Sequence, residues 1–354
     1  MRITQLLPSV HSGDAVGDSA FAIHRALQKQ GIESVILGVH IDDHLRDRAI
    51  DFRYFARYDS PDTVHIYHFA VPSPITYTFK DAKGRKIVIY HNITPPHFFE
   101  GFSEELVAIT TTGRHEIKLL AECTDLGLAD SEFNRLELVQ YGYHTTGVVP
   151  ILLDFQKYAM PAAAHVREQF DDEKINILFV GRITPNKKQE DVIKAFHIYQ
   201  TYVNPNARLL LVGKYNPHET YVTFLHQLIA ELQVRNVYFS GHVTQQELNA
   251  YYQLADVLLS MSEHEGFFVP AVESFYFKLP VLAYNCTAIP YTLGNAGILI
   301  NHKRYAEIAE LIQLVVENPV LQQAIITAQT ARLACFQKER ILTTLFEQLG
   351  VKVL

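Results

Sequence analysis

Two glutamates, Glu265 and Glu273, are separated by seven residues in a stretch that follows a short apolar run at 257–261. The run predicts a buried strand, and Pro270 suits the first turn of a helix, because its missing N–H would be unpaired there anyway. Glu265 then lies in the strand-to-helix loop and Glu273 one turn into the helix. Unpaired N–H groups and a partial positive charge at a helix start favour an anion. A sugar attached to a diphosphate fits such a site.

Arg182 and Lys187 are a second candidate group, in a loop that begins at Gly181 after the predicted strand 175–180. Both side chains could reach one diphosphate, because Arg offers a planar fork of donors and Lys a mobile point charge. A leaving nucleoside diphosphate gains negative charge as the glycosidic bond breaks, so fixed cations lower the barrier. The alternative is two solvated loop charges, and the glutamate stretch beside them favours the phosphate role.

The two glutamates differ from the catalytic pair of a glycoside hydrolase, whose carboxylates lie on opposite sides of the scissile bond. Glu265 on a loop and Glu273 on the adjoining helix would hold hydroxyls from one side. A carboxylate accepts two hydroxyl donors well, so Glu273 suits a ribose diol and Glu265 a hexose. Solvated charges at a helix start are the alternative.

Looser candidates lie at other predicted strand ends. Gly13 and Gly17 precede a helix predicted at 19–28, where backbone N–H groups could meet phosphate or sugar, although an ordinary turn explains them equally well. His91 ends a predicted strand and could donate to a sugar hydroxyl or assist proton transfer, because imidazole titrates near neutrality. Val243 could present backbone groups to a base edge, and a plain turn is its alternative.

Strand-like and helix-like stretches alternate along the whole chain, which predicts an α/β protein with parallel sheets covered on both faces. In such sheets, ligands bind beyond the carboxyl ends of the strands, where the unusual polar residues cluster. The predicted strands are 3–7, 34–37, 64–67, 87–90, 126–129, 147–149, 175–180, 209–212, 237–239, 257–261, 281–283 and 297–300. Thr244 with Glu247 predicts a capping box, and Ser131 predicts a helix cap.

The composition bounds the function. At 354 residues, two domains are expected, and the net charge of −7 argues against nucleic acid as a partner. No run of about 18 apolar residues exists to span a membrane. Three scattered cysteines favour a reducing cytoplasm. No H-E-x-x-H motif or close Cys/His cluster is present, so a metal site has little support.

The segment 154–174 is the best domain boundary, since no strand pattern crosses it. We expect two doubly wound Rossmann-like domains facing across a cleft: an acceptor-side domain at 1–155 and a donor domain at 172–330. The helical segment 331–354 is predicted to pack back on the first domain.

The stretch 262–275 resembles the donor-site motif of the retaining glycosyltransferases of family four, which have the GT-B fold. The resemblance extends from residue 1 to about residue 330 and is most specific in the second half. It is carried by Gly181-Arg182, Lys187, Gly213, Gly241-His-Val243, Glu265 and Glu273, and more loosely by 13–17, 90–95 and 129–134. It implies transfer of a hexose, such as glucose or mannose, from a UDP- or GDP-sugar, with retention of configuration and no obligatory metal.

By position, the resemblance implies that Arg182 and Lys187 hold the diphosphate, that Glu273 holds the ribose, and that Glu265 holds the donor sugar. The backbone of Phe267, Phe268 and Val269 would help to hold that sugar, Gly17 would lie against the diphosphate, and His91 near the reacting sugar. The implied mechanism is front-face attack without a protein nucleophile. Four positions depart from the family pattern: Phe268 replaces a small residue, Lys278 and Thr287 replace glycines, and Tyr291 replaces a glutamate.

The sequence therefore predicts a cytoplasmic hexosyltransferase for polysaccharide, lipopolysaccharide or another glycoconjugate. Its acceptor would be a sugar, a lipid-linked glycan or a small molecule, with peripheral contact to the inner membrane face left open. A catalytically silent nucleotide-sugar-binding scaffold on the same fold is the alternative, motivated by the departures at Phe268, Thr287 and Tyr291. Another GT-B enzyme such as an epimerase fits the Glu265–Glu273 spacing less well.

Overall fold

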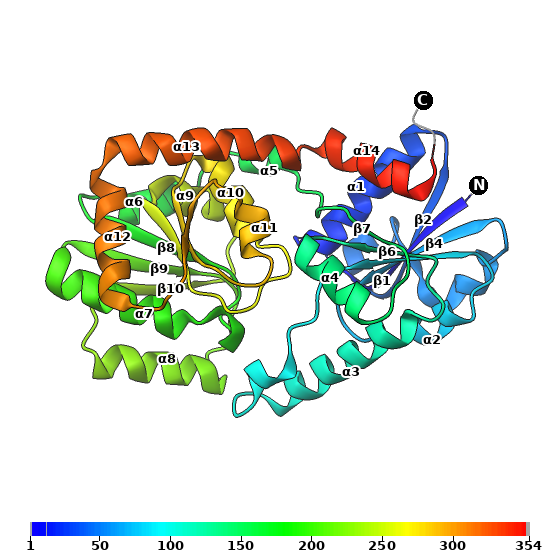
Figure 1. Cartoon of the computed structure of the whole chain (residues 1–354), viewed down its shortest axis with the longest axis horizontal. Coiled ribbons are helices and arrows are strands. Elements are labelled where there is room, and N and C mark those ends of the chain that lie inside the picture. Colours follow the sequence, from blue (N-terminus) through cyan, green and yellow to red (C-terminus); the bar gives the residue numbers. More distant parts are fainter. Residues whose placement is uncertain (1, 12, 352–354) are drawn as a thin grey trace. The chain divides into compact units, whose positions relative to one another are not determined.

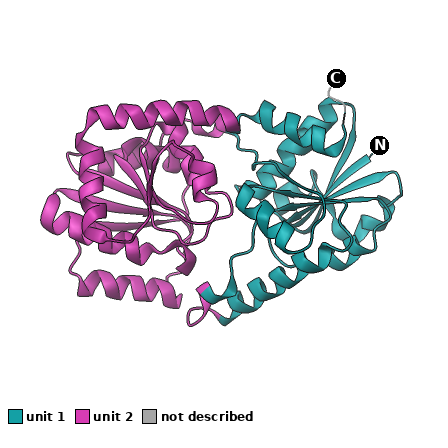
Figure 2. Cartoon of the chain, viewed as in Figure 1, with its two compact units in different colours: residues 1–97, 104–154, 336–354 teal, residues 98–103, 155–335 magenta. Residues whose placement is uncertain are grey.

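A computed structural model describes residues 2–11 and 13–351 of the chain. The chain forms two compact units, coloured separately in Figure 2. Unit 1 comprises residues 1–97, 104–154 and 336–354, and unit 2 comprises residues 98–103 and 155–335. The short segment 98–103 thus belongs to unit 2, although it lies far from the rest of that unit in sequence.

Unit 1 is built on a seven-stranded sheet in the order β3-β2-β1-β4-β5-β6-β7, and its paired strands run parallel (Figure 1). The strands are β1 (Arg2–Val10), β2 (Glu33–Ile41), β3 (Ile50–Asp51), β4 (Thr63–Phe69), β5 (Arg85–Tyr90), β6 (Leu126–Ala129) and β7 (Thr146–Val148). The strand order reverses between β1 and β4, so the carboxyl ends of these two strands mark a topological switch point, where ligands bind in open sheets of this kind.

Helices cover both faces of this sheet because successive strand residues point to opposite sides. Ile87 and Ile89 of β5 join one core with α1 and α14, whereas Val88 and Tyr90 join the other with α2, α3 and α4. The helices of unit 1 are α1 (Ala15–Lys29), α2 (Ile75–Lys80), α3 (Glu104–Leu120), α4 (Glu132–Gln140) and α14 (Lys338–Leu349), with 3-10 turns at Asp43–Leu45, Phe52–Arg57 and Pro96–Phe99.

Unit 2 repeats this plan with six strands in the order β10-β9-β8-β11-β12-β13. They are β8 (Ile175–Val180), β9 (Ala207–Val212), β10 (Val237–Gly241), β11 (Val257–Ser260), β12 (Val281–Tyr284) and β13 (Ile298–Ile300). Here the order reverses between β8 and β11, whose paired residues include Val257 with Ile177. The loops after β8 and β11 therefore meet at the switch point of unit 2.

The largest core of unit 2 lies between its sheet and α7, α8 and α12. The helices of unit 2 are α5 (Phe155–Tyr158), α6 (Ala164–Phe170), α7 (Gln189–Ile198), α8 (Thr220–Glu231), α9 (Gln245–Leu254), α10 (Val269–Phe277), α11 (Ile289–Leu293), α12 (Tyr305–Glu317) and α13 (Pro319–Leu333). Unit 2 also has a 3-10 turn at Pro185–Lys187 and a π-helical turn at Tyr199–Val203, and a 3-10 turn at Ala334–Phe336 lies where the chain passes from unit 2 to unit 1. The predicted α/β class with two doubly wound domains is confirmed.

Local sequence signals agree with several helix starts. Thr244 and Glu247 form the predicted capping box, and the Ser131 side chain accepts from the N–H of Asn134. The predicted start of the first helix at residue 19 is wrong, because α1 begins at Ala15. Gly17 therefore lies inside the first turn of the helix and not before it.

The ends of the units differ from the sequence prediction in detail. The segment 154–174, expected as the domain boundary, includes α5 and α6, whose Tyr158, Val166 and Phe170 are buried. At the other end, α13 and the following turn stay with unit 2 as far as residue 335, and α14 packs with unit 1 through Ile341 and Leu345. Residues 352–354 of the predicted C-terminal segment lie outside the described residues.

Candidate functional site

The loops at the switch point of unit 2 bring two of the predicted residues into contact. Lys187 follows β8 and Glu265 follows β11, and the Lys187 Nζ lies 2.6 Å from the Glu265 Oε2. Their side chains are only 16% and 10% exposed, so water screens this pair less than it would a surface pair. An ammonium has three donors and a carboxylate has several acceptor positions, so each group keeps capacity for a ligand.

Arg182 precedes this pair on the same loop. Its side chain is exposed, and its guanidinium has no partner among residues 2–11 and 13–351. Its backbone is fixed, because the side chain of Gln189 donates to the Arg182 carbonyl at 3.0 Å. A fixed backbone beneath a free guanidinium leaves all five of its donors for an anion.

The glycines beside Arg182 let the strand ends approach each other closely. Gly213 has φ +153°, and a Cβ there would lie 2.0 Å from the carbonyl oxygen of Gly181. Gly213 also forms an isolated bridge with Gly241 at the end of β10. Only glycine permits this packing. Val243 follows Gly241 as a half-buried residue in the loop before α9.

The start of α10 has the predicted proline in its first turn and an unexpected backbone feature at Phe268. This residue caps the helix in the left-handed region, at φ 75°, and its ring is buried. The carbonyl of Phe267 accepts from the hydroxyl of Thr292, which fixes the loop just before Val269.

Glu273 is buried inside unit 2 and is bound by a tyrosine. The Tyr252 hydroxyl donates to Glu273 Oε2 at 2.6 Å. Burial raises the pKa of Glu273, although hydrogen bonds from Tyr252 and Tyr158 oppose that rise. Burial, together with the neighbouring Glu273, also raises the pKa of Tyr252 well above its ordinary value. Glu273 is therefore a held carboxyl and not the solvated charge that was the alternative.

Thr287 holds the backbone of Glu265 in place. Its hydroxyl oxygen accepts from the Glu265 N–H at 3.0 Å, and the Ala288 N–H donates to the Glu265 carbonyl at 3.3 Å. Thr287 adopts φ 45°, a left-handed conformation that is costly for a β-branched residue. Strain of this kind persists where surrounding contacts fix it, and it clusters at functional sites.

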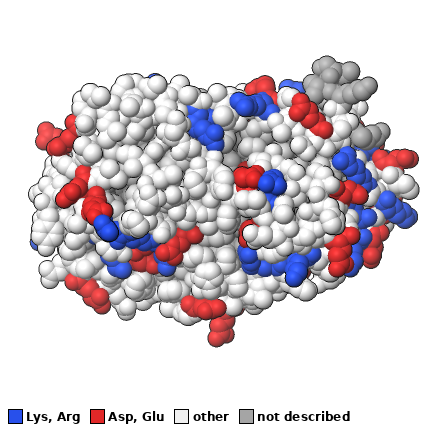
Figure 3. Space-filling view, in the orientation of Figure 1, with Lys and Arg blue, Asp and Glu red and all other residues white. Residues whose placement is uncertain are grey.

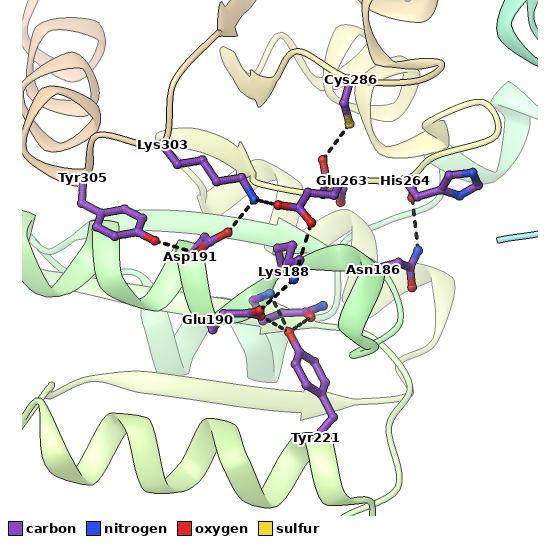
Figure 4. A network of polar contacts seen from close by, with 12 residues as sticks. Asn186, Lys188, Glu190, Asp191, Tyr221, Glu263, His264, Cys286, Lys303 and Tyr305 are labelled. Carbon is purple, nitrogen blue, oxygen red and sulfur yellow. Dashed lines mark hydrogen bonds and ion pairs between the residues drawn. The ribbon is translucent and has the colours of Figure 1, made fainter. Parts of the chain in front are cut away.

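An ion-pair network fixes the loop residue two positions before Glu265 (Figure 4). Lys303 Nζ lies 2.6 Å from both Glu263 Oε1 and Asp191 Oδ2, and the Tyr305 hydroxyl donates to Asp191 at 2.7 Å. Burial alone would lower the pKa of Lys303, but the hydrogen bonds to Asp191 and Glu263 outweigh it and raise the pKa.

Further contacts in Figure 4 tie this loop to the loop after β8. Asn186 donates to the His264 carbonyl at 3.1 Å, and the Glu263 N–H donates to the Asn186 carbonyl at 2.9 Å. Lys188 lies 3.5 Å from Glu263 and 3.4 Å from Glu190, which also contacts the Tyr221 hydroxyl. Consecutive lysines, Lys187 and Lys188, thus pair with alternate glutamates of the facing loop.

The carboxyl edge of the unit 1 sheet carries a second polar group around His91. The His91 Nδ1 lies 2.8 Å from Asp130 Oδ2, and its Nε2 lies 3.0 Å from the His68 Nδ1. The His68 Nε2 lies 3.0 Å from the Gln5 Oε1. Both ring nitrogens of His91 are therefore engaged within unit 1, and neither is free to donate to a sugar as the structure stands.

The glycines of the first loop differ in their role. Gly13 adopts φ 76° with open space around its Cα, so it permits the turn before α1. A Cβ at Gly17 would lie 2.9 Å from the carbonyl of His11, so Gly17 permits close approach of two backbone segments. Asp14 stands at the cap position of α1 without a capping hydrogen bond from its side chain. Ser12, between His11 and Gly13, lies outside the described residues.

Sequence reasoning missed several residues that position the site. Tyr252 and the partners Lys303 and Gln5 gave no local signal in the sequence. Each lies far from its partner in sequence: Tyr252 is 21 residues from Glu273, Gln5 is 63 residues from His68, and Lys303 is 112 residues from Asp191. His68 was missed as well, and its pairing beside Ile89 of β5 places it next to His91.

No group of His, Cys, Asp and Glu within the described ranges could hold a metal ion. Over the face drawn in Figure 3, Lys and Arg lie beside Asp and Glu, and uncharged residues cover most of the surface. No helix in the part of the chain that the structure describes is long and apolar enough to cross a bilayer.

Comparison with known proteins identifies the class. Residues 162–332 match the family described as Glycosyl transferases group 1, and this match covers the switch-point loops of unit 2. A solved structure of Anabaena Alr3699/HepE in complex with UDP-glucose has a TM-score of 0.76 and 19% identity, with 99% of each chain covered. At that identity the likeness shows the fold, which is GT-B.

Two relatives in sequence match most of this chain, and one of them is named a glycosyltransferase. An uncharacterized 41.2 kDa protein in the cps region of Klebsiella pneumoniae is 24% identical over 269 residues, which are 72% of this chain and 70% of that protein. The serotype-specific mannosyltransferase WbdA of Escherichia coli is 22% identical over 302 residues, covering 77% of this chain and 35% of WbdA. The chain thus spans only part of the length of WbdA. Residues 162–332 thus resemble the group 1 glycosyltransferases, and the chain is a glycosyltransferase enzyme, which disfavours the silent scaffold.

Proposed function

We propose that this glycosyltransferase transfers a hexose from a nucleoside diphosphate sugar to a hydroxylated acceptor with retention of configuration. The observation that carries the proposal is the Lys187–Glu265 pair of 2.6 Å at the switch point of unit 2. It joins a cation suited to phosphate with a carboxylate suited to sugar hydroxyls. The start of α10, next along the chain, adds the positive end of a helix dipole.

The roles follow from chemical type and position. Arg182 and Lys187 bind the donor diphosphate, and the charge that develops on the leaving group strengthens these contacts as the bond breaks. Glu265 and the backbone of Phe267, Phe268 and Val269 bind the hexose. Because Thr287 and Lys303 fix the backbone around Glu265, the carboxylate needs little reorganisation when the sugar arrives.

Glu273 is assigned to the ribose diol, with Tyr252 holding one carboxyl oxygen at 2.6 Å. A buried carboxyl whose pKa is raised is costly to keep ionised, and perturbed groups of this kind concentrate at functional sites. Gly181 and Val243 are assigned to backbone contacts with the nucleotide. No residue in these roles acts as a protein nucleophile. The acceptor hydroxyl therefore attacks the sugar from the same face that the diphosphate leaves, and an oxygen of the leaving phosphate takes the hydroxyl proton.

In unit 1, we assign Gly13 and Gly17 to backbone contacts with the donor phosphates and His91 to the neighbourhood of the reacting sugar. The support for these assignments is their place at the carboxyl edge of the sheet, after β1 and β5. Since both ring nitrogens of His91 are engaged, its contribution is that of a positioned ring and charge.

The donor is a UDP- or GDP-hexose, with glucose and mannose as the first candidates. HepE has been solved with UDP-glucose, and WbdA is named a mannosyltransferase, so the two relatives favour different donors. The names of WbdA and of the protein in the cps region favour a surface polysaccharide as the product class. We place the reaction in the cytoplasm, on a glycan, lipid-linked or small-molecule acceptor, because the cysteines Cys123, Cys286 and Cys335 are free.

The test uses Arg182→Ala and Lys187→Ala with Lys174→Ala as the matched control, because Lys174 is a lysine of the same unit that pairs only with nearby Asp172. Slow hydrolysis and transfer are measured with UDP- and GDP-hexoses, and folding is checked by thermal unfolding. The proposal predicts a fall of at least about tenfold in turnover for both site variants, which corresponds to about 1.4 kcal/mol of barrier. Near-normal turnover in both would remove the phosphate role.

A further inference from the structure

Four buried side chains at the carboxyl edge of the unit 1 sheet form one continuous string of hydrogen bonds. It runs from Gln5 on β1 through His68 on β4 and His91 at the end of β5 to Asp130 after β6, with separations of 3.0, 3.0 and 2.8 Å. The planes of the two imidazole rings lie within 4° of each other, with centroids 5.3 Å apart. The rings therefore lie side by side, and one proton can sit in line between them.

The first member fixes the direction of the string. The Gln5 amide nitrogen donates to the carbonyl of Ala20 at 3.0 Å, and a carbonyl can only accept. The amide oxygen of Gln5 must therefore face His68. Because that oxygen also only accepts, the Nε2 of His68 must carry a proton.

Counting protons along the string then fixes its total charge. Each of the three gaps holds one proton, so three protons are shared by two imidazoles and one carboxyl group. Two neutral imidazoles bring two protons and an ionised Asp130 brings none, which would leave one negative charge on the string. The third proton cancels that charge, so the whole string is electrically neutral. It contains one carboxylate and one imidazolium, or their uncharged equivalent.

The environment places the positive charge on His91. His68 is fully buried, and burial followed by repulsion from His91 lowers the pKa of His68 well below its ordinary value. Asp130 contacts His91 directly, and its other oxygen, Oδ1, is buried without a partner among residues 2–11 and 13–351. A buried carboxylate with one unsatisfied oxygen needs a charged neighbour to remain ionised.

We propose that Gln5 and His68 are positioning residues that hold His91 as a doubly protonated imidazolium paired with the Asp130 carboxylate. The His68 Nδ1 accepts from the His91 Nε2, and the Asp130 Oδ2 accepts from the His91 Nδ1. His91 is then a fixed cation whose protons are both in use. It takes up no proton during the reaction, which leaves the acceptor proton to an oxygen of the substrate.

Two further ionisable groups, Glu137 and Arg114, contact each other near the string, and Asn92, the residue after His91, contacts Glu137. Asn92 donates to Glu137 Oε2 at 3.1 Å, and Glu137 pairs with Arg114 at 2.9 Å. The opposite charges of Glu137 on α4 and Arg114 on α3 balance each other. The charge of His91 is therefore balanced by Asp130. The significance of His91 for turnover rests on the proposed function, whereas its charge state does not.

The experiment is nitrogen NMR of the histidine rings in the full chain without donor, recorded across the neutral pH range. The wild type is compared with Gln5→Met, which keeps the side-chain length but removes the acceptor of His68. Thr4→Val is the matched control, because Thr4 bonds the neighbouring buried histidine of β4, His65, at 2.7 Å. The expected wild-type result is a His91 ring with protons on both nitrogens at neutral pH.

In Gln5→Met, His68 is free to move its proton to Nδ1 and to donate to His91. His91 then keeps only its proton toward Asp130, so its Nε2 loses its proton at neutral pH. Thr4→Val leaves both protons on His91. A singly protonated His91 in the wild type at neutral pH, or a doubly protonated His91 in Gln5→Met, would overturn the proposal.

A second variant, His68→Phe, removes the acceptor of His91 directly and predicts the same loss of the Nε2 proton, so a poorly folding Gln5→Met does not block the test. The transfer assay separates this inference from the proposed function. A doubly protonated His91 in a chain that transfers no hexose would refute the function alone. A singly protonated His91 in an active transferase would refute the string alone.

Discussion

Tyr252→Phe is predicted to weaken folding by an amount that depends on pH. The Tyr252 hydroxyl donates to Glu273, which is buried, and no other change of shape accompanies its removal. A hydrogen bond to a charged group contributes about 1.5–3 kcal/mol, and one to a neutral group about 0.5–1.5 kcal/mol. The expected loss is therefore about 1.5–3 kcal/mol where Glu273 is ionised and about 0.5–1.5 kcal/mol where it is protonated.

The direction of the pH dependence follows from the shifted pKa of Glu273. Burial raises this pKa in the folded state above its ordinary value, so the native chain binds the proton more tightly than the unfolded chain. Stability is then fully present below the unfolded pKa of about 4.3 and declines as pH rises through the folded pKa. Because the Tyr252 bond opposes the rise, removing it raises the folded pKa further. The extra loss in Tyr252→Phe therefore develops on the alkaline side of that pKa.

The assay is urea unfolding of the wild type and Tyr252→Phe near pH 4 and near pH 7.5, with Tyr199→Phe as control. Tyr199 is another buried tyrosine of unit 2, and its hydroxyl donates to the neutral amide of Gln313 at 2.7 Å. Its loss should be about 0.5–1.5 kcal/mol at either pH. If Tyr252→Phe lost the same free energy at both values, Glu273 would not be the ionisable partner that the geometry describes.

Two further predictions concern the loop that holds Glu265. Thr287→Gly and Thr287→Ala both lose the hydrogen bond to the Glu265 N–H, so the donor KM should rise by a similar factor in both variants. Glycine also relieves the left-handed strain, so Thr287→Gly should be about 1–2 kcal/mol more stable than Thr287→Ala by thermal unfolding. Equal stability would contradict the strain. Lys303→Met leaves Glu263 and Asp191 without their shared cation and should raise the donor KM. The free energy of unfolding should fall by about 1–2 kcal/mol, which is less than for a fully buried pair because the Glu263 side chain is 34% exposed. An unchanged KM despite lost stability would show that the network does not reach the site.

The parallel sheets were predictable because buried strands appear in the sequence as short apolar runs between helical stretches. All twelve predicted strands are present with boundaries within a few residues, and the one missed is β3, whose two residues give no pattern. The backbone of the special loops was less predictable. Lys278 and Thr287 stand where the family resemblance implied glycines, and both adopt positive φ, so the resemblance marked left-handed positions that the residue types conceal.

The candidate site was predictable in part. The sequence singled out four residues at strand ends or helix starts, where spacing along the chain alone predicts their position. They are Arg182, Lys187, Glu265 and Glu273. The contact between Lys187 and Glu265 could not be predicted in this way, because it depends on β8 and β11 being neighbours in the sheet. Partners such as Tyr252 were hidden for the same reason, since a helix pattern shows which face is buried but not which polar group meets it there.

Calorimetric titration of UDP- and GDP-hexoses into the wild type and Lys187→Met tests the central claim most directly. The account predicts saturable binding of one nucleotide series by the wild type. It predicts at least roughly tenfold weaker binding by the variant, since a charge-assisted contact contributes about 1.5–3 kcal/mol. Equal affinity in the two proteins, or no binding of any nucleotide sugar by the wild type, would contradict it.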